Sequence, residues 1–349
     1  MFALFALPAL MGLAFLIGVF DDDDEDTASP ISPDDETPEP LVSPDDEGIE
    51  VPADVTDYQG TPADEQITSR EAGGTVRGGG PDTLVGSDAQ DDLYGGTGQD
   101  SITAGAGNDN VYGGRGNDLL DTGLGNDTAV GDSGDDVINT RAGDDRVSAG
   151  FGDDTVYAGG GNDSVDASFG DDLVYLGSGD DLYSAYGFPG LEGDDTVLAG
   201  DGNDLVRDNN GSNMLSGEAG NDTLFTYDPL TYNGEARLGE SDTVQGGTGD
   251  DLMQIDDGDE ATGGDGADTF EVSALSGQAA VRILDFDPAT DVLQFDDERF
   301  ESVSGETSIT FNAADSTIRV SVGDQQIAIL SGLAETDVDN IELVLVSAA

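Results

Sequence analysis

Residues 113–121 read GGRGNDLLD, and this nine-residue pattern recurs along the middle of the chain. Its general form is G-G-x-G-(N/D)-D-x-φ-x, where φ is apolar or aromatic, and we number its positions 1 to 9. Position 6 returns as Asp at a constant spacing of nine residues. This regular series is Asp82, Asp91, Asp100, Asp109, Asp118, Asp127, Asp136, Asp145, Asp154, Asp163, Asp172 and Asp181. A fixed period over many copies indicates a repeat architecture, so this pattern decides the fold.

An apolar or aromatic residue stands two positions after every Asp of the series, from Leu84 to Tyr183. Gly at positions 1, 2 and 4 permits positive φ and close backbone approach, so the first six residues can form a tight turn. The last three residues are long enough only for a short strand. One apolar side chain per strand cannot make a core alone, and stacked copies are needed to form a continuous apolar ladder. The sequence therefore predicts an all-β solenoid.

Stacking would place the Asp of each copy level with the Asp of neighbouring copies. Carboxylates at a strand spacing of about 4.8 Å repel one another strongly unless a cation lies between them. Sites built from carboxylate and carbonyl oxygens suit Ca²⁺, which takes roughly 6 to 8 oxygen ligands. A solvated acidic surface is the alternative. It does not explain why Glu is missing from Ala72 to Leu191 although the preceding segment uses Glu freely.

In these features the chain resembles the RTX (repeats-in-toxin) family, whose nonapeptide G-G-x-G-x-D-x-U-x builds a calcium-binding, right-handed parallel β-roll. The resemblance covers residues 77–271. It implies that two successive nonapeptides form one coil, and that position-6 carboxylates and turn carbonyls hold each of several Ca²⁺ ions between turns. It assigns this role to the regular series above and to a less even continuation, Asp195, Asp204, Asp222, Asp242, Asp251 and Asp268.

The repeats are not perfect, and we expect impaired sites beside the breaks. The breaks are an insertion around Gly187 to Gly193, Asn213 in place of an acid, an insertion from Thr226 to Glu240 and a slipped copy at Glu260. Early copies are weakened by Ser87, Ala89, Asp132 and Arg141, each of which replaces Gly. Position 5 alternates between Asp and Asn, which favours a turn-capping role over ion ligation.

The N-terminal part differs from the repeats. Residues 1–20 are apolar and just reach the ~20 residues that a membrane-spanning helix needs. An uncleaved anchor helix is slightly favoured over a cleaved secretory signal, because the positively charged start of a signal is missing. Residues 21–70 are acidic, rich in Pro, Thr and Ser, and poor in apolar residues, which predicts a disordered spacer.

The C-terminal part, residues 272–349, contains runs typical of strands and predicts a small β-rich cap. Ile283–Phe286 and Asp291–Phe295 resemble the segment that closes RTX rolls in proteins exported by type I secretion, whose C-terminal export signal is not cleaved. A cap without an export function is the alternative.

Composition excludes several classes of function. The 349 residues include 76 acidic and 10 basic residues, a net charge of -66 that opposes folding without counter-ions. All basic residues are Arg and form no cluster, so nucleic-acid binding is excluded. The chain has no His and no Cys, which excludes His-based catalysis, Cys nucleophiles, the His- and Cys-containing zinc sites, and disulfides.

We therefore expect a calcium-binding extracellular or cell-surface protein that folds on binding Ca²⁺ and has a structural or adhesive role without enzymatic activity. Its expected partners are calcium ions, cell-surface or matrix components and, through residues 1–20, the membrane. The alternative is a calcium-dependent accessory module, or a secreted module related to enzymes or toxins, that acts on protein or polysaccharide. Ice binding is disfavoured because position 7 carries no regular Thr ladder.

Overall fold

The structure is a computed structural model that describes residues 48–52, 55, 57–69, 73–185, 193–209, 211–226, 231–232, 235–236, 241–256, 258–273, 279–296, 307–341 and 343–346. The predicted hydrophobic helix, residues 1–20, lies outside the described residues. Residues 21–47 of the predicted spacer also lie outside them. Within the described ranges, no helix is long and apolar enough to cross a bilayer.

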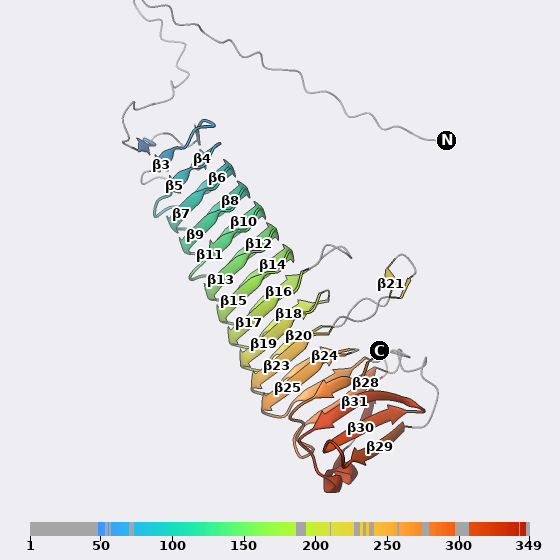
Figure 1. Cartoon of the computed structure of the whole chain (residues 1–349). Coiled ribbons are helices and arrows are strands. Elements are labelled where there is room, and N and C mark those ends of the chain that lie inside the picture. Colours follow the sequence, from blue (N-terminus) through green and yellow to red (C-terminus); the bar gives the residue numbers. More distant parts are fainter. Residues whose placement is uncertain are drawn as a thin grey trace, which may run out of the picture. The chain divides into compact units, whose positions relative to one another are not determined.

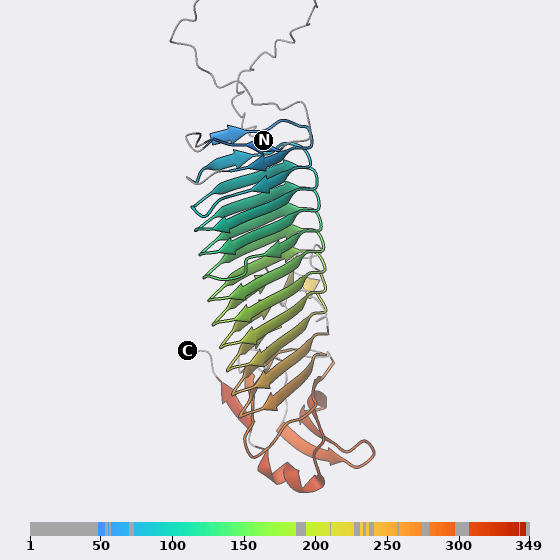
Figure 2. The ribbon, with the colours of Figure 1, turned by 90° about the vertical axis from the view of Figure 1, so that its left-hand side faces the viewer.

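Two long sheets run along the molecule, and the chain alternates between them (Figure 1 and Figure 2). Sheet A contains, in spatial order, β1 (Ile49–Glu50), β3 (Gln66–Thr68), β5 (Thr83–Val85), β7 (Ser101–Ala106), β9 (Leu119–Leu124), β11 (Val137–Asn139), β13 (Thr155–Gly160), β15 (Leu173–Ser178), β17 (Thr196–Asp201), β19 (Met214–Ala219), β23 (Thr243–Thr248), β25 (Glu260–Asp265), β27 (Val281–Ile283), β31 (Gln325–Ser331), β30 (Thr317–Val322) and β29 (Thr307–Asn312). Sheet B contains β2 (Asp57–Gln59), β4 (Thr75–Arg77), β6 (Asp92–Thr97), β8 (Asn110–Arg115), β10 (Thr128–Ser133), β12 (Arg146–Phe151), β14 (Ser164–Phe169), β16 (Leu182–Ala185), β18 (Leu205–Asp208), β20 (Thr223–Phe225), β24 (Leu252–Ile255), β26 (Thr269–Val272), β28 (Val292–Asp296) and β32 (Leu343–Val346). A short antiparallel pair, β21 (Thr231–Tyr232) and β22 (Glu235–Ala236), and a 3₁₀ helix, η1 (Glu335–Asn340), complete the described elements.

Each coil of the regular run consists of two nonapeptides, as the family resemblance implied. Val147 of β12 pairs with Val165 of β14 in sheet B, and Val156 of β13 pairs with Val174 of β15 in sheet A. Both pairs are parallel and 18 residues apart. The predicted parallel β-solenoid is therefore confirmed.

Most strands of the regular run contain six residues, whereas the pattern predicted three. Strand β13, for example, covers positions 7 to 9 of one nonapeptide and positions 1 to 3 of the next. The prediction was wrong because the Gly-rich start of a nonapeptide still pairs with the next coil, as Gly159 does with Gly177. Only positions 4 to 6 remain as the turn.

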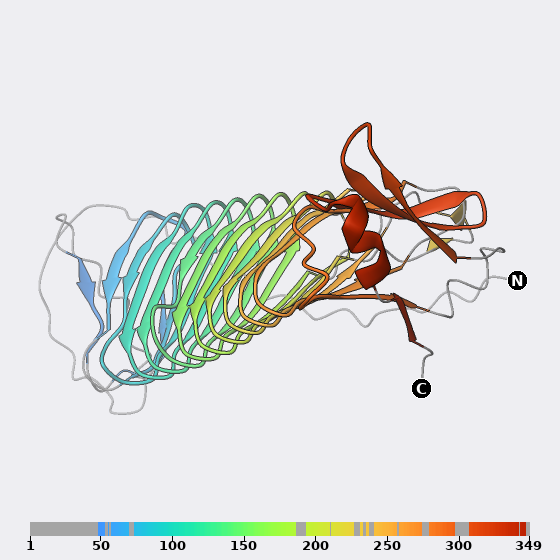
Figure 3. The ribbon, with the colours of Figure 1, turned by 90° about the horizontal axis from the view of Figure 1, so that it is seen from below.

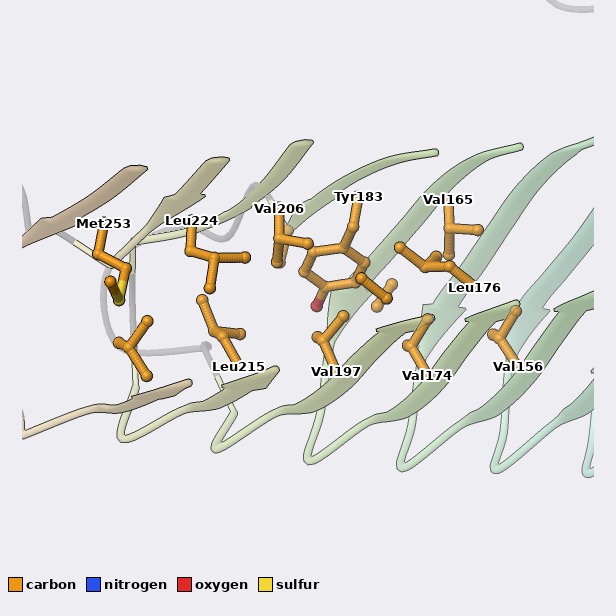
Figure 4. Close-up of a cluster of buried hydrophobic side chains, with 14 of the residues drawn as sticks. Val156, Val165, Val174, Leu176, Tyr183, Val197, Val206, Leu215, Leu224 and Met253 are labelled. Atoms are coloured by element: carbon orange, nitrogen blue, oxygen red, sulfur yellow. The ribbon is translucent and has the colours of Figure 1, made fainter. Parts of the chain in front are cut away.

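The core is a single column of apolar side chains between the two sheets (Figure 4). Every position-8 residue of the regular series is buried, from Leu84 to Tyr183. Position 1 also points inward, since Ala149, Ala158 and Leu176 are fully buried. Two inward positions per nonapeptide explain how a chain so rich in Gly and Asp fills its interior.

The stack of coils begins earlier than predicted. Strands β1, β2 and β3 lie within the segment that was expected to be disordered up to residue 70, and the first coil pairs with the next one at Ile49↔Ile67. Val51 and Ile67 are buried in the same core. The prediction of a disordered spacer was wrong for this part of the chain, because a few inward apolar residues suffice when a preformed sheet edge offers main-chain partners.

The C-terminal strands continue the two sheets (Figure 3). Strands β27 and β28 pair in parallel with β25 and β26, and β31 and β32 follow them in the same manner. Only β30 and β29 are antiparallel, at the end of sheet A. The predicted β-rich region is thus present, but its first strands belong to the roll and the boundary at residue 272 falls inside β26.

Aromatic rings on the outer faces stack between successive coils. Tyr94 lies over Tyr112 in sheet B with ring centroids 4.6 Å apart, and Tyr157 lies over Tyr175 in sheet A at 5.0 Å. The ring planes of each pair are within 5° of parallel. Such cross-strand pairs add to the stabilisation of neighbouring coils.

Candidate calcium sites

The position-6 residues form two rows, one at the turns that enter each sheet. Row A, at the turns entering sheet A, contains Asp82, Asp100, Asp118, Asp136, Asp154, Asp172, Asp195, Asn213, Asp242 and Asp259. Row B, at the turns entering sheet B, contains Asp91, Asp109, Asp127, Asp145, Asp163, Asp181, Asp204, Asp222, Asp251, Asp268 and Asp291. All eighteen Asp residues predicted as ligands lie in these rows, and none of them is more than 5% exposed.

One carboxylate oxygen of each row member is used to join the coils. Its Oδ1 accepts a hydrogen bond from the main-chain N–H of the residue one coil earlier, as Asp154 does from Asp136 and Asp163 from Asp145. The N···O distances along the two rows are 2.6–3.2 Å. Row members therefore form two unbroken ladders of side chain to main chain.

The second carboxylate oxygen is buried without a partner in most row members. This applies to Oδ2 of Asp100, Asp109, Asp118, Asp127, Asp136, Asp145, Asp154, Asp163, Asp172, Asp181, Asp204, Asp222, Asp251 and Asp268. Leaving one buried polar atom unbonded is costly, and an unpaired charge costs more. So many unbonded oxygens in register fit the binding of cations.

The surroundings of the free oxygen also fit a hard cation. A Cβ added to Gly113, at position 1, would lie 2.5 Å from Oδ2 of Asp118 and 3.0 Å from the carbonyl oxygen of Gly131 in the next coil. A carboxylate oxygen and a carbonyl oxygen thus face the same small space, and such oxygens are the ligands that Ca²⁺ prefers. Within the described ranges, no group of three or more acidic side chains could hold a metal alone. An ion at a row therefore also needs main-chain oxygens.

Gly at positions 2 and 4 is required by the backbone of the turn. Gly114 and Gly116 have φ angles of 110° and 124°, which side chains rarely adopt. A Cβ on Gly116 would lie only 1.7 Å from the carbonyl oxygen of Gly98 in the preceding coil. Asp132 and Arg141 replace Gly at position 2, and both take the left-handed conformation there, with φ of 74° and 62°. These weakened copies therefore keep the fold of the turn.

The rows have a strongly unfavourable electrostatic environment in the absence of ions. No described basic side chain forms a salt bridge with the fourteen carboxylates that have a free oxygen, and neighbouring coils place like charges beside each one. Two unit charges about 4.8 Å apart repel by about 3.5 kcal/mol at an effective dielectric constant of about 20. Burial raises the pKa of Asp136, Asp154 and Asp163 to about 7, opposed by the main-chain hydrogen bond and reinforced by nearby carboxylates. The same causes raise the pKa of Asp172 to about 9.

Position 5 forms a second, exposed ladder that runs in the opposite direction. Its side-chain oxygen accepts from the main-chain N–H one coil later, as in Asp171 to Asp153 at 3.1 Å and Asp180 to Asn162 at 3.1 Å. One oxygen is enough for this bond, which explains why Asn and Asp alternate here. Position 5 thus joins successive coils, and its expected role without ion ligation stays a prediction.

The breaks in the repeat do not interrupt the ladders. Asp172 donates to Asp195 across the first insertion at 2.9 Å, and Asp222 donates to Asp251 across the second at 2.8 Å. Asn213 keeps its place in row A through its carboxamide oxygen, which accepts from Asp195 at 2.9 Å. The coils beside the insertions therefore stay in register, because the strands on either side of each insertion remain paired.

Two row members were missed by the sequence analysis. Asp259 follows Asp242 after 17 residues, and Asp291 follows Asp268 after 23, so neither falls on the nine-residue spacing. Each still has an apolar residue two positions later, Ala261 and Leu293, both fully buried. This pairing of Asp with an inward apolar residue is the signal that would have found them.

Comparison with known families agrees with the geometry. The sequence matches the RTX calcium-binding nonapeptide repeat over residues 78–102, 85–120, 94–129, 121–156, 148–183, 189–224 and 239–259. No curated protein matches the chain. Over residues 78–259 the chain therefore belongs to the family of RTX calcium-binding nonapeptide repeats, which bind multiple Ca²⁺ ions.

Proposed function

We propose that this chain is an extracellular or cell-surface protein with a structural or adhesive role, and that its roll folds when Ca²⁺ binds to rows A and B. The ligands are the fourteen Asp residues whose Oδ2 is buried without a partner. That set of unbonded oxygens is the observation that carries the proposal. Calcium neutralises both rows and joins each coil to the next.

Location follows from the expected strength of binding. Extracellular calcium modules bind at about 10⁻⁴ to 10⁻³ M, far above the free Ca²⁺ of a cytosol. With a net charge of -66 and empty rows, the chain repels itself and stays unfolded. Outside the cell the ions bind only the native turns and shift the equilibrium to the folded state.

A non-enzymatic role is supported by what the sequence supplies. The chain has no His and no Cys, and most of its described buried acidic residues are used in ladders that join coils. The described coils present the same repeated turn many times. We therefore propose that the protein is a scaffold and not an enzyme. In this proposal residues 1–20 attach it to the membrane.

The test compares the full-length chain in chelator with the same chain in millimolar Ca²⁺ and, as control, in equal Mg²⁺. We expect far-UV circular dichroism to change from disordered to β-rich with Ca²⁺ only, because Mg²⁺ gives up its water reluctantly and demands a stricter geometry. A spectrum that does not respond to Ca²⁺ would refute calcium-driven folding. Fractionation of cells grown with and without chelator shows whether the chain stays with membranes or enters the medium.

A further inference from the structure

The two rows differ in their C-terminal halves. In row B every member from Asp109 to Asp268 has an unbonded Oδ2. In row A the unbonded oxygens run only from Asp100 to Asp172. The next four members, Asp195, Asn213, Asp242 and Asp259, have none.

Protein groups occupy the second oxygen in this part of row A. The hydroxyl of Tyr183 donates to Oδ2 of Asp195 at 2.8 Å and lies 3.3 Å from Oδ2 of the buried Asp208. Tyr183 comes from β16 in sheet B, and its ring crosses the core with the hydroxyl on the far side (Figure 4). An ion at Asp195 would have to displace this fully buried hydroxyl.

Asn213 and Asp259 of row A also lack a free, charged oxygen that could bind an ion. Asn213 is an amide and carries no charge. Asp259 accepts at Oδ2 from the Thr226 hydroxyl at 2.9 Å and from the main-chain N–H of Asp256 at 2.8 Å. The turns of Asp195, Asn213 and Asp259 thus have a protein donor or a neutral side chain where the earlier turns have a free, charged oxygen.

The residue at position 1 changes one coil after Asp195. In the row A turns it is Gly95, Gly113, Gly131, Ala149, Ala167 and Ala185, and then Asp208, Thr226 and Ile255. The small residues cannot reach the carboxylates, whereas Asp208 and Thr226 are polar, buried and next to them. The row B turns keep Ala199, Gly217, Gly246 and Gly263 through these coils.

Turn length separates the two rows at the same coils. β16 ends at Ala185 and β17 begins at Thr196, and β20 ends at Phe225 while β23 begins at Thr243, so two of the connections that enter sheet A are long. The row B turns stay short, with β17 ending at Asp201 and β18 beginning at Leu205. Long turns thus precede Asp195 and Asp242, whereas the turns that precede Asn213 and Asp259 stay short.

We infer that the calcium row beside sheet A ends at Asp172, and that the later row A turns are held by protein hydrogen bonds in place of ions. Row B carries ions through Asp268. The inference rests on the proposed function, because it assumes that the free carboxylate oxygens are the calcium ligands. On this inference, both rows of the roll bind Ca²⁺ in its first half, and only row B binds Ca²⁺ in its second half.

The test compares three isosteric variants of the full chain, Asp195→Asn, Asp204→Asn and Asp172→Asn. Asp195 and Asp204 lie in the same coil on opposite rows, and each Asn keeps the Oδ1 acceptor of its ladder. Bound Ca²⁺ per chain is measured by native mass spectrometry at saturating Ca²⁺, after circular dichroism has shown that each variant folds. We expect Asp204→Asn and Asp172→Asn each to lose at least one ion and Asp195→Asn to lose none.

Equal losses in Asp195→Asn and Asp204→Asn would overturn the inference and leave calcium binding by the rows intact. No loss in Asp204→Asn and Asp172→Asn would refute the proposed ligands and the inference with them. A crystal structure of the unaltered chain with Ca²⁺ gives an independent count that needs no variant. Ion density beside Asp195 or Asp242 in that structure would also overturn the inference.

Discussion

A single carboxylate at position 6 performs two separate tasks with its two oxygens. Oδ1 accepts the main-chain hydrogen bond that joins coils, and Asn213 shows that an amide performs this task equally well. The free Oδ2 is what an amide cannot replace, because it supplies the negative charge that a cation needs. A position-5 side chain only accepts a main-chain hydrogen bond between coils, so either Asn or Asp can occupy this position.

This difference gives a matched test at neighbouring residues. Asp153→Asn should leave the midpoint of a calcium titration unchanged, because Asn retains the acceptor for Asp171 and a surface change has effects within about 0.5 kcal/mol. Asp154→Asn should weaken binding by about tenfold or more, since even outer partners of metal ligands have effects of that order. Isothermal titration calorimetry of the two variants measures both. Equal midpoints would show that the free Oδ2 is not a ligand.

Spacing alone identified the residues of the regular rows, because the nine-residue period survives without any knowledge of contacts. It could not show which oxygen is bonded, since both oxygens of an Asp look the same in a sequence. Tyr183 was interpreted as an apolar position, which is correct for its ring. The hydroxyl reaches Asp195 across the core, and no local pattern reports a contact between opposite sheets.

Each strand presents one face to the core and the other to solvent, so neighbouring residues differ sharply in what they tolerate. Val156→Asp in β13 should lower the melting temperature of the calcium-loaded roll strongly, because an unpaired polar group at this fully buried position costs about 2 to 7 kcal/mol. Thr155→Asp, which points outward, should change it little. Coincident melts of the two variants, followed by circular dichroism, would contradict the observed strand register.

The ends of the roll were harder to predict than its middle. In the first coils the Gly and Asp positions of the pattern are missing, and only scattered apolar residues such as Val51 and Ile67 remain. Such residues become a coil because the edge of an already ordered sheet offers main-chain partners, which is a non-local effect. The same reason explains why β27 and β28 join the roll although their segment lacks the Gly-rich turn.

Across the whole molecule, the two rows link calcium to protons. In the calcium-free roll, burial raises the pKa of Asp154 to about 7 and of Asp172 to about 9, against about 3.9 in an unfolded chain. The folded state then binds more protons than the unfolded state, so its stability is greatest at acidic pH and falls as pH rises from about 4 to about 7 and above. Acid can therefore partly replace calcium.

We expect the chain in chelator to be unfolded at pH 8 and to regain β-structure as the pH is lowered toward 5. With saturating Ca²⁺ the trend should reverse, because ligands must be deprotonated and acid releases the ions. Melting temperatures measured across this pH range with chelator and with Ca²⁺ check both signs. A calcium-free stability that increases with pH would contradict the buried position of the carboxylates.

The stacked tyrosines give the molecule an optical property of its own. The chain contains no Trp, so its near-ultraviolet absorption and emission come from Tyr and, more weakly, Phe. Parallel rings 4.6 Å and 5.0 Å apart couple their electronic transitions, and each pair exists only while two particular coils are in contact. Tyr94 and Tyr112 thus report on the contact between β6 and β8, and Tyr157 and Tyr175 on that between β13 and β15. The assembly of two separate places in the roll can be followed with ultraviolet light and no added label.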